Sequence, residues 1–121
     1  MKAVTSLTQQ HCQPCEGIGK AMTRDEAAGY LTKVPCWQIS SDAKTISRSY
    51  LMKNFMSGVK LINLIAGIAE AENHHPDIHL SGYRNLRVDL STHALKGLTE
   101  NDFIVAAKIN ELPAELKINK G

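Results

Sequence analysis

A single apolar run at helical spacing most constrains the fold of this chain: NFMSGVKLINLIAGIAEAENH, residues 54–74. It predicts a helix from about residue 53, with an apolar stripe at Phe55, Val59, Ile62, Ala66 and Ala69. Further apolar residues widen that stripe: Met56, Leu61, Leu64, Ile65 and Ile68. We therefore expect a second side of the helix to be buried as well, either deeper in the same core or against another subunit.

The end of this helix is marked by ENHHPD, which places two histidines side by side. Pro76 disfavours helical geometry at His75, so the helix should end near His74. The pair is compatible with metal ligation, with a polar helix terminus that favours the macrodipole, or with acid–base chemistry. Adjacent side chains normally diverge, which weakens the metal interpretation.

The flanking segments predict two further helices and two hairpins. Thr23 is a candidate N-cap for a helix over TRDEAAGYLTKV, and Thr99 for one over GLTENDFIVAAKINEL, where Asp102 completes an acidic capping-box variant. Period-two alternation predicts strands at CWQIS and TISRSYLM, joined by SDAK. A second strand pair, DIHLS and LRVDLST, flanks the turn GYRN.

This order, αββαββα, predicts an α+β fold. We expect a two-layer sandwich in which three helices cover one face of a four-stranded antiparallel sheet. The 121 residues suit one domain, 1–121, whose first 20 residues form an irregular or mobile lead-in.

Composition excludes several classes of function. The net charge of +2, with no basic run, argues against nucleic-acid binding, and no stretch approaches the ~20 apolar residues of a membrane span. The N-terminus lacks the apolar region of a secretory signal, and three cysteines are an odd number. We expect a cytoplasmic protein with free thiols.

Two groups of residues could carry chemistry. Cys12 and Cys15, in CQPC, could be half of a zinc site with His11, but no second pair follows; we assign them no metal or redox role. Histidines 74, 75, 79 and 93 fall within twenty residues. Each alone is best explained as a helix-terminal or solvated residue. Together, beside loops and without a nucleophile, they favour proton transfer, with His93 at a strand end facing away from the core.

The spacing of Glu70, His74-His75-Pro76, Tyr83, His93 and Asp102 resembles the signature of the pterin-4a-carbinolamine dehydratases. THALKGLTENDF and the segment from Trp37 to Pro76 are also similar to that family, and CQPC resembles its bacterial members. The likeness covers nearly the whole chain.

This resemblance implies a hydro-lyase that converts 4a-hydroxytetrahydropterin to quinonoid dihydropterin and water, without metal or organic cofactor. Such an enzyme recycles the pterin cofactor of aromatic amino acid hydroxylases, such as phenylalanine hydroxylase. The family's catalytic histidines fall on His74, His75 and His93, with Asp102 as the supporting carboxylate. The substrate-binding positions fall on Glu70, Pro76 and Thr92.

The roles of the three histidines are a hypothesis: His74 and His93 transfer protons, and His75 holds the pterin. The resemblance also implies a homodimer or homotetramer assembled through the central helix. The alternative is a non-catalytic protein-interaction module of the same fold, like a dimerisation cofactor, which would not need all three histidines.

Overall fold

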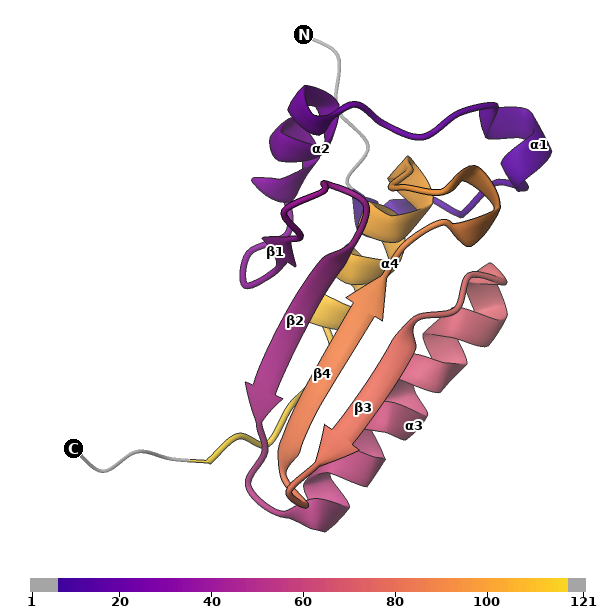
Figure 1. Ribbon diagram of the computed structural model, residues 1–121. Coiled ribbons are helices and arrows are strands. Elements are labelled where there is room, and N and C mark those ends of the chain that lie inside the picture. The colour runs from indigo at the N-terminus through magenta and orange to yellow at the C-terminus, as the bar shows by residue number, and fades with distance from the viewer. Residues whose placement is uncertain (1–6, 118–121) are drawn as a thin grey trace, which may run out of the picture.

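The protein is described here by a computed structural model over residues 7–117 (Figure 1). Its elements are η1 (Leu7–Gln9), α1 (Cys15–Ile18), α2 (Arg24–Leu31), β1 (Gln38–Ile39), β2 (Ile46–Leu51), α3 (Phe55–Glu72), β3 (Asp77–Ser81), β4 (Asn85–Leu90), η2 (His93–Leu95) and α4 (Glu100–Asn110). None of the helices in this range is long and apolar enough to cross a membrane.

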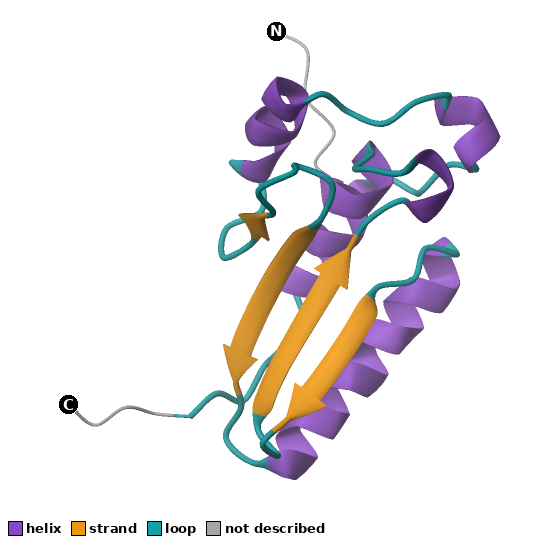
Figure 2. Cartoon of the chain, in the orientation of Figure 1, coloured by secondary structure: helices purple, strands orange, loops and turns teal. Residues whose placement is uncertain are grey.

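The four strands form one antiparallel sheet in the order β1-β2-β4-β3. Helices α3 and α4 lie behind this sheet and contact each other, and no helix within residues 7–117 covers the opposite face (Figures 1 and 2). Helix α2 packs against α4 and β1. The α+β architecture predicted from the sequence is confirmed.

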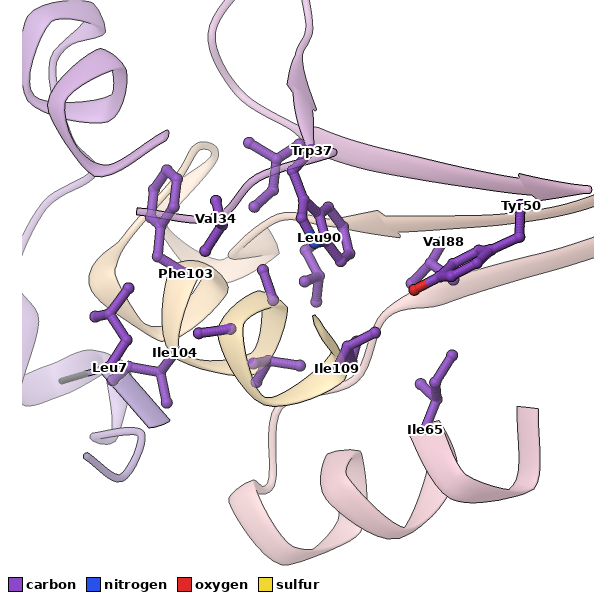
Figure 3. Close-up of a cluster of buried hydrophobic side chains, with 14 of the residues drawn as sticks. Leu7, Val34, Trp37, Tyr50, Ile65, Val88, Leu90, Phe103, Ile104 and Ile109 are labelled. Carbon is purple, nitrogen blue, oxygen red and sulfur yellow. The ribbon is translucent and has the colours of Figure 1, made fainter. Parts of the chain in front are cut away.

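The core lies between the sheet and the helices (Figure 3). Leu86, Val88 and Leu90 point inward from β4 and are at most 1% exposed, as their alternation predicted. Phe103 and Ile109 of α4 pack on the same cluster. Burial of such side chains contributes roughly 1.5–3 kcal/mol each, so this layer fixes the relative positions of β4 and α4.

Helix α3 buries a face that matches the predicted stripe only in part. Its buried apolar residues are Leu61, Ile65 and Ala69, whereas Phe55 is 50% exposed. Gly58 lies on the buried face, where a Cβ would lie 3.3 Å from Leu80 of β3. The stripe prediction was right for Ala69, which is buried, and for Ile62, which packs against the core, but wrong for Phe55 and Ala66, which are exposed.

The N-terminal lead-in contains two short helical turns, η1 and α1, and packs on the domain. Leu7 is buried in the core, and η1 lies against α4. Residues 1–6 of the predicted lead-in lie outside the described part of the chain. Strand β1 is only two residues long, and Cys36 cannot belong to it because its positive φ of 75° is not extended geometry.

Candidate active site

The exit of α3 is built around Asn73. This residue adopts the left-handed conformation, with φ of 51°, in which asparagine is one of the few tolerated residues. The N–H of His74 then returns to the carbonyl oxygen of Ala69 at 3.1 Å, which closes the helix end. With Pro76 directly behind, the chain leaves the helix axis between the two histidines, so their rings have separate surroundings.

His74 is held by a buried carboxylate. Its Nε2 lies 2.7 Å from Oδ1 of Asp102, and the two side chains are 11% and 0% exposed. The other oxygen, Oδ2, accepts hydrogen bonds from the Thr92 hydroxyl and from the backbone N–H of Thr99, both at 2.9 Å. An ionised carboxylate only accepts hydrogen bonds, so beside an ionised Asp102 the hydrogen of this contact lies on Nε2 of His74.

Asp102 therefore makes two kinds of interaction. By accepting the Thr99 N–H it stabilises the first turn of α4, as the capping pattern predicted, and by accepting from His74 it orients an imidazole. The capping interpretation of this residue is confirmed, and its functional role beside His74 stays a prediction.

His75 has a more open environment. Its Nε2 lies 2.6 Å from Oε2 of Glu70, one turn back on α3. The two side chains are 54% and 77% exposed, so this contact is a surface pair, which contributes little to stability. Its geometric effect is to fix one nitrogen of the ring.

His93 lies in a turn, which corrects its predicted position at a strand end. Strand β4 ends at Leu90, and His93 opens the 3-10 turn η2. The turn forms because Thr92 and Gly97 pair across it, with the Thr92 N–H 2.8 Å from the Gly97 carbonyl oxygen. The His93 side chain is exposed, and it has no hydrogen bond or ion pair within residues 7–117.

The three histidines line one pocket of about 220 Å³ between the end of α3 and the loop after β4. Its lining residues are Asn73, His74, His75, Ser91, Thr92, His93 and Ala94. Asp102, Glu70 and Pro76 do not line this pocket. Asp102 is joined to it by the contact with His74, and Glu70 by the contact with His75.

Sequence reasoning missed Asn73, Ser91 and Ala94 as lining residues. Asn73 could have been found, because asparagine is the usual alternative to glycine at a left-handed helix end. Ser91 and Ala94 carry no such signal; they line the pocket because they flank the Thr92–His93 turn.

Two residues that the sequence grouped with this site lie elsewhere. His79 is on β3, with Nε2 3.3 Å from Oδ2 of Asp89 on β4. Tyr83 is in the β3–β4 turn, at the end of these strands away from the histidine pocket, and adopts a φ of 55°. His79 was already left out of the proposed chemistry.

Two other hollows are larger. One, of about 590 Å³, lies on strands of the sheet around His79, and the other, of about 650 Å³, lies beside Arg84 and residues 114–117. Neither hollow is lined by more than one histidine, so the pocket lined by three histidines is the better candidate for proton transfer. Within residues 7–117, no group of three or more His, Cys, Asp or Glu side chains is arranged to hold a metal ion, and Cys12 and Cys36 are free thiols.

The fold and the pocket together define a small α+β protein with a histidine site suited to proton transfer. The family model described as pterin 4 alpha carbinolamine dehydratase matches residues 20–112, and the chain belongs to this family of hydro-lyases.

Among its relatives, pterin-4-alpha-carbinolamine dehydratase 2, mitochondrial, of Arabidopsis thaliana is 43% identical over 121 residues. That alignment covers 98% of this chain but 65% of the plant protein, which is longer. A putative pterin-4-alpha-carbinolamine dehydratase of Legionella pneumophila strain Paris is 44% identical over 109 residues, covering 89% of this chain and 96% of the relative.

Two solved structures share the fold. One, a transcriptional coactivator/pterin dehydratase from Brucella melitensis, has a TM-score of 0.70 and 31% identity, covering 75% of this chain and 96% of that one. The other, a pterin dehydratase-like protein described as a RuBisCO assembly factor in the alpha-carboxysome, has a TM-score of 0.51 and 16% identity, covering 61% and 84%. The second likeness shows the fold alone.

Proposed function

We propose that this chain converts 4a-hydroxytetrahydropterin to quinonoid dihydropterin and water by histidine acid–base catalysis. The observation that supports the proposal most strongly is that His74, His75 and His93 line one pocket, with a fully buried carboxylate behind His74. Family membership supports the same reaction. A non-histidine nucleophile is not required by this chemistry.

The elimination requires two proton transfers. The bond between C4a and the hydroxyl oxygen breaks, the oxygen leaves as water after receiving a proton, and a ring nitrogen loses a proton. A neutral His74 accepts the ring proton on Nδ1, because Asp102 holds Nε2–H and stabilises the imidazolium that forms. His93 donates the proton to the leaving oxygen. Proton exchange with water resets both rings.

The remaining residues have supporting roles in this scheme. His75, with one nitrogen fixed by Glu70, binds and orients the pterin. The Thr92 hydroxyl, which bonds Asp102, holds the carboxylate in place and lines the pocket. Pro76 sets the direction of the chain beyond His75. No metal or organic cofactor takes part.

A direct assay tests the proposal. The 4a-carbinolamine is generated by an aromatic amino acid hydroxylase, and the appearance of quinonoid dihydropterin is followed with and without purified protein. We expect substoichiometric protein to accelerate dehydration, and a variant with all three histidines changed to alanine to lose that acceleration. A wild-type protein that leaves the spontaneous rate unchanged would refute the proposal.

A second candidate is a non-catalytic interaction module of the same fold. The Brucella melitensis structure, described as a transcriptional coactivator/pterin dehydratase, supports it. The intact set of pocket histidines favours the enzyme, because a scaffold has no use for them. The same assay separates the two, since a scaffold gives no acceleration.

Three finer expectations stay predictions. Assembly through α3 is supported by its exposed apolar residues Phe55, Met56 and Leu64. A physiological link to phenylalanine hydroxylase follows from the proposed substrate. A cytoplasmic location is expected from the sequence, although the Arabidopsis relative is named as mitochondrial.

A further inference from the structure

Residues 11–13, which we call the strap, lie outside the family match and bond to residues close in sequence to His74 and Asp102. They precede α1, which lies at the same end of the molecule as the C-terminal end of α3 and the start of α4 (Figure 1). The strap bonds to both of these helices. Its contacts are made largely through backbone groups.

The first contact is with Glu72, the last residue of α3, two positions before His74. The Glu72 carboxylate is 5% exposed and accepts the backbone N–H of Cys12 at 2.8 Å. It also contacts Nδ1 of His11 at 3.0 Å and Nζ of Lys108, on α4, at 2.5 Å. Glu72 thus joins the strap, the end of α3 and α4 at one buried carboxylate.

The second contact is with Asn101, the residue directly before Asp102. Its Oδ1 accepts the backbone N–H of Gln13 at 2.9 Å, and its Nδ2 donates to the backbone carbonyl of Gln13 at 2.7 Å. Asn101 is 3% exposed, and its carbonyl oxygen also accepts a hydrogen bond from Sγ of Cys12 at 3.6 Å. Such a two-way amide contact fixes both the distance and the direction of the strap.

These contacts lie close in sequence to His74 and Asp102, the two residues whose side chains bond to each other. Consecutive strap residues bond to the residue before Asp102 and to the residue two before His74. A hollow of about 170 Å³ is lined by Cys12, Gln13, Pro14, Glu72 and Asn73, and it shares Asn73 with the histidine pocket. The strap is therefore coupled to the helix exit that presents His74.

We propose that Glu72 and Asn101, by binding the strap, are positioning residues that hold His74 and Asp102 in register for proton transfer. The proposal rests on the proposed dehydratase function. Its physical basis is that catalytic groups need placement within about 0.5 Å, and a displacement of about 1 Å can reduce the rate about a hundredfold. Without the strap, the end of α3 and the start of α4 lose a shared set of buried hydrogen bonds.

Two variants open the strap from opposite sides. Asn101→Ala removes both amide bonds, and Gln13→Pro removes the N–H that Asn101 accepts. Gln13→Ala retains both backbone groups and serves as the matched variant. Glu100→Gln, which neutralises the neighbouring residue on α4 that bonds Tyr30, controls for changes in the first turn of this helix.

Opening of the strap is measured through Cys12 in a Cys15→Ala, Cys36→Ser background. Burial, followed by the charge of Glu72, raises the pKa of the Cys12 thiol to about 12, so a docked strap protects it from iodoacetamide. We expect Asn101→Ala and Gln13→Pro to increase the labelling rate by about tenfold or more. Gln13→Ala is expected to label like the parent protein.

The functional readouts are kcat, KM and the NMR resonance of the His74 ring N–H, assigned by its loss in Asp102→Asn. In both strap-opening variants we expect kcat to fall by about tenfold or more with KM within about threefold, and the ring resonance to shift or broaden. Glu100→Gln should keep wild-type kcat. The resonance is observed without substrate, so it reports on the strap even if the protein proves not to be a dehydratase.

The proposal is overturned if strap-opening variants label rapidly at Cys12 yet keep the wild-type resonance and kcat. That result would mean that the strap covers the helix ends without positioning the pair. If one variant fails to fold, the same measurements on the other variant still test the proposal, because each removes a different partner of the same contact.

Discussion

Nε2 of His74 and Oδ1 of Asp102 lie 2.7 Å apart, although 28 residues separate them along the chain. The contact joins the exit of α3 to the first turn of α4. It gives the ring of one pocket histidine a hydrogen-bond partner, while the ring of His93 has none within residues 7–117. The two rings therefore differ in environment, as a division between base and acid requires.

Replacing Asp102 by asparagine should remove that difference. The asparagine NH₂ group can donate to Nε2 of His74, which favours the tautomer with its hydrogen on Nδ1. Nδ1 then cannot accept a proton. We expect kcat to fall by about 10²–10⁴-fold, and the loss of a buried hydrogen-bond acceptor to cost about 1–3 kcal/mol of stability. Steady-state kinetics and thermal unfolding measure the two effects. Asp102→Asn with wild-type kcat would exclude Asp102 from the mechanism.

Gly97 controls the turn that carries His93. A Cβ on this residue would lie 2.8 Å from Cβ of Ala21, so Gly97→Ala must displace either the turn or the segment before α2. We expect a loss of about 1–3 kcal/mol in the free energy of unfolding, with a lower kcat because Thr92 and His93 move with the turn. Gly29→Ala is the control, since a Cβ there meets nothing within 4 Å in helix α2. Equal melting temperatures for the two variants would contradict the packing argument.

Glu72 should make stability depend on pH. Burial acts to raise its pKa, but hydrogen bonds from Lys108, Cys12 and His11 outweigh that effect and lower the pKa from 4.5 to about 2. Because the folded pKa is depressed, the stabilisation is present above about pH 4.5 and is lost as the pH falls toward about 2.

The measurement is the difference in melting temperature between wild type and Glu72→Gln. We expect this difference to be largest near pH 7 and to shrink as the pH falls through the range from about 4.5 to 2. A difference that stays constant over that range would show that the Glu72 charge does not stabilise the fold.

The exposed apolar side of α3 predicts an oligomer. Met56 is 70% exposed and Phe55 50%, so a charge here should be costly only if the surface is covered by another copy. We expect Met56→Glu to reduce the mass measured by light scattering, and Ser41→Glu, an exposed change in the β1–β2 turn, to leave it unchanged. A wild-type protein that is already monomeric would contradict assembly through this face.

Much of the scaffold could be predicted because it depends on local rules. Thr23 and Asp102 act at helix N-termini as their positions in the sequence indicate, and α3 ends shortly before Pro76, as that proline predicted. Leu86, Val88 and Leu90 point inward because strand side chains alternate. The histidine pair and its neighbours follow from these elements.

The rest depends on contacts that sequence patterns do not record. The buried face of α3 includes Gly58, Leu61 and Ile65, whereas periodicity favoured a stripe that began at Phe55, which is exposed. The strap is held through the backbone N–H groups of Cys12 and Gln13, which every residue except proline has. The turn at His93 depends on pairing between Thr92 and Gly97, which ended β4 earlier than its alternation suggested.

The most direct test of the account is the kcat for carbinolamine dehydration of three single variants, His74→Ala, His75→Ala and His93→Ala. We expect His74→Ala and His93→Ala to lower kcat by about 10²-fold or more, and His75→Ala to act mainly on KM. If His75→Ala is the most damaging to kcat, or if none of the three lowers it, the assignment of proton transfer to His74 and His93 is wrong.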